Sequence, residues 1–190
     1  MGQTFNWQEL PANLPEPADD GACDHLRGMR LPPAPLLATS GATVDLAALA
    51  GRTVVYCYPR TGRPDEPSPD GWDAIPGARG CTPQSCAFRD HYAKLRGLGA
   101  EVFGLSTQDT AYQREAVERL HLPFPLLSDA DLRFARALRL PTFTVAGMTL
   151  LKRVTLVVRE GQIEQVWYPV FPPDTNAGAV VGWLREHPLR

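Results

Sequence analysis

The segment PGARGCTPQSCAFRD, residues 76–90, places Cys81 and Cys86 five residues apart. Two cysteines this close can form a structural disulfide, contribute ligands to a metal site or act as a redox pair. The chain has four cysteines in all, and the other two, Cys23 and Cys57, lie outside this segment. The elements that position the pair decide which chemistry applies.

The residues after Cys81 have the composition of a helix start. Thr82 suits the N-cap and Pro83 the first helical position, and the helical pattern runs to about Leu98. Cys81 would therefore lie beside unpaired backbone N–H groups and the positive end of the helix dipole, which stabilise a thiolate. Cys86 lies more than one turn further along. This arrangement favours a thiolate that is oxidised to a sulfenic acid and then condenses with a second thiol.

The other two chemistries fit the pair poorly. Zinc needs a second pair of ligands, whereas His91 and His121 are each isolated in the sequence. A static disulfide is disfavoured by the helix geometry and by the reducing compartment that we expect. Cys57 lies in an apolar run and is interpreted as an inert buried thiol. Cys23 is interpreted as an ordinary thiol, although the neighbouring His25 could activate it.

The bulk composition excludes several classes of protein. The chain has 190 residues, 44% of them hydrophobic, which suits one domain. A net charge of -2 and a pI of about 6.1 give no reason to expect nucleic acid or an anionic membrane as a partner. We find no apolar run of membrane-spanning length and no secretory signal pattern, so we expect a soluble cytoplasmic protein.

The order of predicted elements indicates an α/β fold. Residues 1–35 are rich in proline and are predicted to form an irregular arm, with one helical turn near residues 7–10. Residues 36–190 are predicted to form the folded domain.

Within this domain, two short strands around Ser40-Gly41 and a helical turn at 46–50 come first. Further strands are predicted at 53–58, 100–106, 125–129, 153–158 and 162–168, and helices at 83–98, 110–120, 130–140 and 174–187. Thr110 and Gln113 form a predicted capping box, and Asp174 is the predicted cap of the last helix. This order is typical of a thioredoxin-like fold with a central mixed β-sheet flanked by helices.

The segment GCTPQSCAFRD resembles the active-site segment of the peroxiredoxins, in particular the bacterioferritin-comigratory-protein or peroxiredoxin Q class. The resemblance runs from about Leu31 to Leu184 and includes YCYPR, VFGLSTQD, FPLLSD and KRVTLVV. It implies that Cys81 is the peroxidatic cysteine and Cys86 the resolving cysteine. It also places the catalytic arginine of the family at Arg153.

The resemblance implies a thiol-dependent peroxidase that reduces hydrogen peroxide and organic hydroperoxides without metal, haem or flavin. A sulfenic acid on Cys81 would be resolved by Cys86 as an intramolecular disulfide. Thioredoxin or a similar dithiol protein would be the reductant, and we expect a monomer or a weak homodimer. Two alternatives stay open. One is a thiol–disulfide oxidoreductase, although that class generally uses Cys-x-x-Cys; the other is a non-enzymatic redox sensor.

One part of the family pattern is altered. The family has a threonine three residues before the peroxidatic cysteine, and here that position is Ala78. Counted from the preceding strand, Thr61 takes the threonine position and an insertion follows it. We expect residues 60–80 to form an ordered flap at the rim of the active site, with Trp72 at least half buried.

Two arginines near the motif are given structural roles. Arg79 directly precedes Gly80 and is expected to be a solvated loop side chain. Arg89 lies eight residues beyond Cys81, about 12 Å along a helix axis, and is expected to brace the structure.

Overall fold

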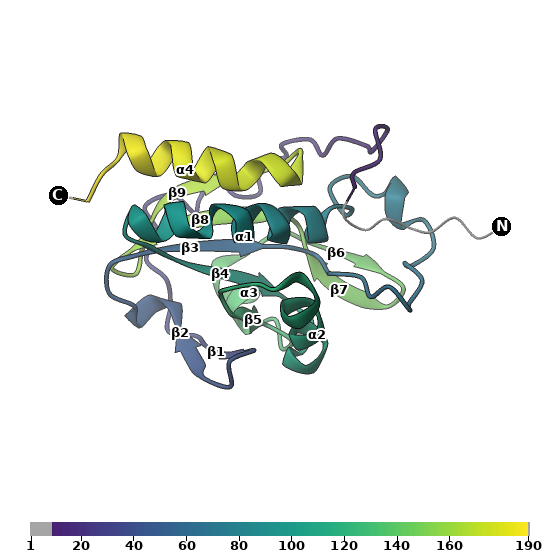
Figure 1. The fold of residues 1–190 in the computed structure, drawn as a ribbon, viewed down its shortest axis with the longest axis horizontal. Helices are drawn as coiled ribbons and strands as arrows, with labels where there is room; N and C mark the ends of the chain where they lie inside the picture. The colour runs from purple at the N-terminus through teal and green to yellow at the C-terminus, as the bar shows by residue number, and fades with distance from the viewer. Residues whose placement is uncertain (1–8, 190) are drawn as a thin grey trace.

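The computed structural model describes residues 9–189, which form a seven-stranded mixed sheet flanked by helices, with a separate two-stranded hairpin (Figure 1). The sheet order is β2-β1-β5-β4-β3-β8-β9, in which β3, β4 and β5 are parallel and the other neighbours antiparallel. Its strands are β1 (Pro35–Ala38), β2 (Thr43–Asp45), β3 (Arg52–Cys57), β4 (Ala100–Ser106), β5 (Leu126–Ser128), β8 (Val154–Arg159) and β9 (Gln162–Trp167). The predicted α/β fold with a central mixed sheet is confirmed.

The α-helices that flank the sheet in residues 9–189 are α1 (Cys81–Gly97), α2 (Thr110–Leu120), α3 (Arg133–Leu138) and α4 (Asn176–Glu186). Three short 3-10 helices, η1 (Leu46–Ala48), η2 (Trp72–Ala74) and η3 (Pro173–Thr175), lie in the connections. The helical turn predicted near residues 7–10 falls partly on residues 7 and 8, which lie outside the described residues.

The strand β3 is buried on both faces, as its continuous apolar run predicts. Val54 and Tyr56 pack with side chains of α1, α2 and α4. Val55 and Cys57 point to the other face and pack with α3 and with Leu26 of the N-terminal arm. The strand thus connects two apolar cores, and α1 and α4 lie side by side over one of them (Figure 1).

The described part of the N-terminal arm is irregular but packed against the domain. Cys23, Leu26 and Leu31 are buried in the same core as β3. Arg30 makes an isolated β-bridge with Gln162 of β9. The arm therefore covers one face of the sheet.

The hairpin outside the main sheet was missed by the sequence reasoning. Strands β6 (Thr142–Val145) and β7 (Met148–Leu151) pair antiparallel around Ala146-Gly147, both of which have positive φ. The alternating pattern TFTV-AG-MTLL is the signal that could have predicted it. The hairpin supports the inserted flap, because Trp72 packs against Leu150 and Phe143.

The predicted capping box of α2 was wrong. Asp109 is the N-cap, and its Oδ1 accepts a hydrogen bond of 2.7 Å from the backbone N of Tyr112. Gln113 is instead fully buried and donates from Nε2 to Ser106 Oγ (3.0 Å) and to the carbonyl oxygen of Leu127 (2.8 Å). The Gln113 Nε2 group thus finds its acceptors in the interior, and the side chain takes no part in capping α2.

The predicted cap of α4 was also wrong. Asp174 lies inside η3, and α4 begins at Asn176 after Thr175, which makes no side-chain capping bond. Proline at residue 173 starts the short 3-10 turn and shifts the helix start by two residues.

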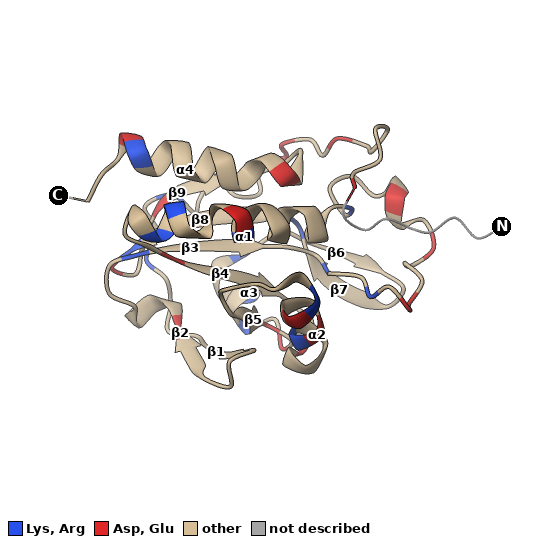
Figure 2. Cartoon of the chain, viewed as in Figure 1, with Lys and Arg blue, Asp and Glu red and all other residues tan. Residues whose placement is uncertain are grey.

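Charges of both signs are interspersed over the surface elements. Helices α1, α2 and α4 each carry acidic and basic residues (Figure 2). Within residues 9–189, no helix is both long enough and apolar enough to cross a membrane.

Candidate active site

The helix α1 begins at Cys81 itself, so the prediction of Thr82 as N-cap was wrong. Gly80 is the N-cap, with φ 108° and ψ 18°, and its carbonyl oxygen accepts from the backbone N of Gln84 at 3.0 Å. A Cβ on Gly80 would lie 2.4 Å from Cγ of Pro173. Only glycine fits this turn. Because the helix starts directly after Gly80, Cys81 lies in the first turn, where backbone N–H groups lack helical partners.

Arg153, directly before β8, lies against the Cys81 sulfur. Its Nη2 donates to Cys81 Sγ at 3.4 Å, and Cys81 Sγ lies 3.7 Å from the carbonyl oxygen of Ala78. The same Nη2 donates to the carbonyl oxygens of Gly77, Ala78 and Arg79 at 3.2–3.3 Å. Arg153 is 3% exposed and Cys81 is 4% exposed. A fixed cation thus faces a buried sulfur at a helix N-terminus.

A buried chain of hydrogen bonds holds this arginine in place. Arg153 Nη1 donates to Gln84 Oε1 in the first turns of α1. Gln84 Nε2 donates to Asn176 Oδ1 (3.1 Å), which also accepts from Thr155 Oγ1 (2.7 Å). Because Thr155 and Gln84 both donate to the same amide oxygen, the orientation of each amide is set. The sequence reasoning missed Gln84 and Asn176. Gln84 lies three positions after Cys81, which puts both side chains on one face of the helix.

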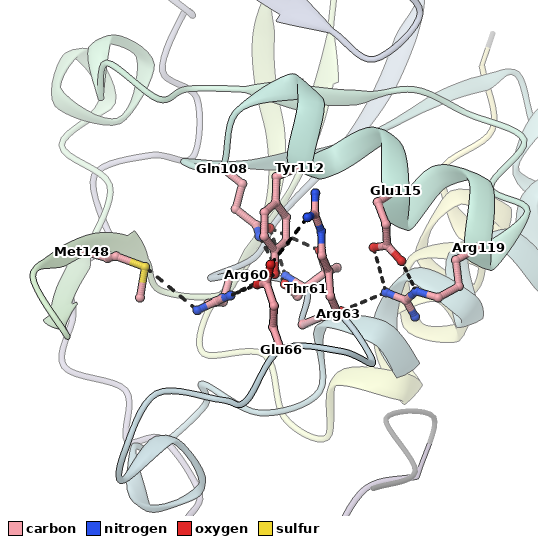
Figure 3. Close-up of polar contacts among 10 residues, drawn as sticks. Arg60, Thr61, Arg63, Glu66, Gln108, Tyr112, Glu115, Arg119 and Met148 are labelled. Carbon is pink, nitrogen blue, oxygen red and sulfur yellow. Dashed lines mark hydrogen bonds and ion pairs between the residues drawn. The ribbon is translucent and has the colours of Figure 1, made fainter.

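Thr61 forms its hydrogen bonds with Gln108. It is fully buried, and its Oγ1 donates to Gln108 Oε1 at 3.3 Å (Figure 3). Its backbone N donates to the same oxygen at 3.0 Å, and Gln108 Nε2 donates back to the carbonyl oxygen of Thr61 at 3.1 Å. The structure therefore brings Cys81 and Arg153 together and bonds Thr61 to Gln108, two residues after β4.

A small cavity of about 20 Å³ opens at Cys81. The start of α1 supplies Gly80, Cys81, Thr82 and Pro83 to its lining. The flap, defined as residues 60–80, supplies the remaining lining residues, which are Arg60, Gly62, Pro67, Ser68, Pro69, Trp72 and Arg79.

Two expectations about the flap have clear outcomes. Trp72 is 5% exposed, which confirms that it is at least half buried. Arg79 was expected to be solvated, and this was wrong. It is 6% exposed and donates from Nη1 to Asp73 Oδ1 at 3.0 Å. The insertion folds back over Arg79 and buries it beside its acidic partner.

Cys86 lies further along α1 and is partly buried against the core that contains Phe88. Burial raises the pKa of the Cys86 thiol, although the positive charge of Arg89 acts in the opposite direction. Arg89 donates from Nη1 to the carbonyl oxygen of Leu120 at 2.9 Å, which confirms its bracing role. Both Cys81 and Cys86 are free thiols within one continuous helix.

The remaining cysteines, Cys23 and Cys57, are both buried thiols, and burial was expected for Cys57. Cys57 is fully buried, and burial raises the pKa of its thiol well above the ordinary value. Burial also raises the pKa of Cys23 to about 12, with nearby Asp20 adding to the effect. His25 Nε2 donates to the carbonyl oxygen of Leu138 at 2.8 Å. Within residues 9–189, no group of three or more His, Cys, Asp or Glu side chains is arranged to hold a metal ion.

Comparison with known proteins agrees with this geometry. The redoxin family model matches residues 26–181. The chain is 33% identical over 162 residues to the chloroplastic peroxiredoxin Q of Oryza sativa subsp. japonica, covering 84% of this chain and 67% of the relative. Among solved structures, peroxiredoxin Q of Xanthomonas campestris is 25% identical with a TM-score of 0.64, covering 92% of this chain and 96% of the other. Peroxidoxin BcpB of Mycobacterium tuberculosis has the same fold, with a TM-score of 0.68 at 24% identity over 84% of this chain and 96% of the other. These likenesses confirm the predicted thioredoxin-like fold.

Proposed function

Because the chain belongs to the redoxin family and is a thiol peroxidase of the peroxiredoxin Q class, we propose that Cys81 attacks the peroxide and that Cys86 resolves the oxidised enzyme. The observation that supports this assignment most directly is the 3.4 Å contact between Arg153 Nη2 and Cys81 Sγ at the start of α1. Neither Cys23 nor Cys57 has such a setting, since both are buried in the apolar core on the other face of the sheet.

In the first step, the Cys81 thiolate attacks the terminal oxygen of a hydroperoxide, ROOH. An S–O bond forms and the O–O bond breaks, which leaves the sulfenic acid Cys81–SOH and an alkoxide that takes a proton from water. With hydrogen peroxide the leaving group is hydroxide. Negative charge thus moves from sulfur to the leaving oxygen, and Arg153 and the first N–H groups of α1 are placed to stabilise it. Arginine suits this role because it stays charged and presents its donors in a rigid fork.

In the second step, Cys86 attacks the sulfur of Cys81–SOH. The S–S bond forms, the S–O bond breaks, and the hydroxyl group leaves as water with the proton of the Cys86 thiol. Cys86 is the candidate because it is on the same helix as Cys81 and is partly exposed. A dithiol then reduces the disulfide by exchange and is itself oxidised to a disulfide.

We extend the proposal to the two partners of the reaction. The oxidising substrates are hydrogen peroxide and organic hydroperoxides, and the reductant is a thioredoxin-like dithiol protein. The support for a protein reductant is that Cys86 is only partly buried on α1, so an incoming thiolate can approach the disulfide.

The decisive experiment measures peroxide consumption with a dithiol reductant for the wild type, Cys81→Ser, Cys86→Ser and the control Cys23→Ser. We expect Cys81→Ser to be inactive, because a serine hydroxyl is not ionised at neutral pH. Cys86→Ser should form the sulfenic acid but no intramolecular disulfide, and Cys23→Ser should keep most of its activity. Appreciable turnover by Cys81→Ser would exclude the mechanism. Reduction of protein disulfides without peroxide consumption would favour a thiol–disulfide oxidoreductase.

A further inference from the structure

The cavity at Cys81 is very small for an organic substrate. Its volume is about 20 Å³. On the same scale, roughly 10–15 Å³ holds one water molecule and about 150 Å³ holds a benzene ring. The space therefore fits the two oxygen atoms of a peroxide group, and an aromatic or branched substituent on it would have to lie outside this cavity.

The flap lines this cavity, and a group of polar contacts fastens the flap to α2. We call these side chains the latch: Arg60, Arg63 and Glu66 of the flap, and Tyr112 of α2. Figure 3 shows the three flap side chains gathered around Tyr112. Arg60 Nη2 donates to Tyr112 Oη, which donates to Glu66 Oε2, both at 2.9 Å. The guanidinium carbon of Arg63 lies 4.1 Å from the centre of the Tyr112 ring.

Each latch residue has a partner in another part of the chain or within the latch. Arg63 Nη1 pairs with Glu66 Oε1 at 3.5 Å, and Arg60 Nη1 lies 4.0 Å from Met148 Sδ on β7. Burial raises the pKa of Tyr112, so its hydroxyl keeps the proton that it donates to Glu66. One tyrosine hydroxyl thus connects two charged residues of the flap to α2.

Arg60 also separates the small cavity from a larger one. It lines both the cavity at Cys81 and a second cavity of about 450 Å³. The second cavity is bounded by apolar side chains, Leu132, Met148 and Leu150, and by Tyr112. Moving the Arg60 side chain would join the two spaces, and the Tyr112 hydroxyl is one of the groups that hold it.

We propose that the latch sets the size limit of the peroxide substrate, so that hydrogen peroxide reacts faster than bulky organic hydroperoxides. The organic part of a larger substrate enters only when the Arg60–Tyr112 contact opens toward the second cavity. This inference rests on the proposed peroxidase chemistry of Cys81 and adds the residues that select among peroxides.

The test compares single-turnover rate constants for oxidation of Cys81 by hydrogen peroxide, tert-butyl hydroperoxide and cumene hydroperoxide. In the wild type we expect the rate constant to fall as the substrate becomes larger. Tyr112→Phe removes only the hydroxyl and with it two hydrogen bonds to charged groups. The ratio of the cumene to the hydrogen peroxide rate constant should then rise by roughly tenfold or more. Glu66→Gln is the second variant and should move the ratio in the same direction.

The matched control is Tyr92→Phe, which removes a tyrosine hydroxyl from α1 at a site where the ring packs against Phe124. It should leave the ratio of rate constants as in the wild type. Thermal melting of each variant verifies that it is folded. The inference is wrong if the wild type reacts equally fast with all three peroxides, or if neither latch variant changes the ratio. Failure of the peroxidase proposal is distinct, because then no peroxide would oxidise Cys81.

Discussion

One guanidinium holds both the Cys81 sulfur and the helix that carries it: Arg153 donates from Nη2 to Cys81 Sγ at 3.4 Å and from Nη1 to Gln84 Oε1. The two acceptors lie three residues apart on α1, and the arginine reaches them from the start of β8. The Arg153 guanidinium therefore contacts the reacting sulfur and the helix α1 at the same time. A substitution of Arg153 should therefore affect both the reaction at Cys81 and the stability of the first turn of α1.

Arg153→Lys should be nearly as damaging as Arg153→Ala. A lysine ammonium group is a point charge and cannot reach the sulfur, the loop carbonyls and Gln84 at once. We expect the second-order rate constant for oxidation of Cys81 by hydrogen peroxide to fall on the order of 100-fold or more in both variants. Stopped-flow kinetics under single-turnover conditions measures it.

The control for charge alone is Arg159→Lys at the far end of the same strand, where Arg159 Nη1 lies 3.8 Å from Glu164 Oε1. It should react with peroxide like the wild type. An Arg153→Lys variant that retains near-normal kinetics would remove the arginine from the transition state.

Gly80→Ala should destabilise the protein and slow its reaction with peroxide. The residue has φ 108°, and an added Cβ would lie 2.4 Å from Pro173 Cγ and 2.8 Å from Leu10 Cδ2. We expect the free energy of unfolding to fall by about 1–3 kcal/mol, because both the backbone and the packing oppose a side chain there. Denaturant unfolding measures the loss.

The matched control is Gly178→Ala in α4. Its added Cβ would meet no atom within 4 Å, and its φ is not positive. Alanine is favoured over glycine in a helix by about 0.5–1 kcal/mol, so this variant should be slightly more stable than the wild type. Equal stability of the two alanine variants would show that Gly80 is not required by the turn.

The sequence was informative where structure is decided locally. The apolar runs of β3 and β4 and the glycine and proline around α1 predicted those elements within a residue or two. The cap of α2 was missed by one residue, because Asp109 and Thr110 are both favourable capping residues. When two neighbouring residues are equally good N-caps, only the backbone geometry shows which of them caps the helix.

The polar interior of the site was harder to predict. Gln84 finds Asn176 across 92 residues of sequence, and Arg79 is buried because the flap returns over it to supply Asp73. Counting from the preceding strand gave Thr61 the position of the family threonine, and its bond to Gln108 could not be predicted from that count. The role of Thr61 beside Cys81 therefore stays a prediction.

Disulfide formation should accelerate as the pH rises. Only the Cys86 thiolate attacks the sulfenic acid, and burial raises the pKa of the Cys86 thiol. Below that pKa the thiolate fraction grows about tenfold per pH unit, so the rate of the second kinetic phase should rise with this slope between about pH 6 and 8. Stopped-flow measurement after a single addition of peroxide separates this phase from oxidation of Cys81.

Two cysteine variants serve as controls for the pH dependence of the second phase. Cys86→Ser should lack the second phase at every pH, and Cys23→Ser should show it unchanged, since the pKa of Cys23, raised to about 12, leaves it protonated. A rate that is flat or falls with increasing pH would mean that thiolate formation at Cys86 does not limit resolution.

Resolution should require the start of α1 to unwind. Five residues of α-helix advance about 7.5 Å and rotate about 140°, which places the Cα atoms of Cys81 and Cys86 roughly 8–9 Å apart. A disulfide needs Cα atoms within about 7 Å. Gln84 lies between the two cysteines, so unwinding must also break its bond to Arg153. The proline at position 83 eases this opening, because it contributes no N–H to the first turn.

Amide hydrogen exchange should detect this change. Exchange across residues 80–90 should increase strongly in the oxidised enzyme relative to the reduced one, while exchange in α4, which packs beside α1, changes less. Gln84→Leu should slow the attack on peroxide, because it removes an acceptor that positions Arg153, and should speed disulfide formation, because it releases the helix. A Cys81–Cys86 disulfide inside an intact helix, or a disulfide between Cys81 and Cys23, would show that the enzyme resolves by another route.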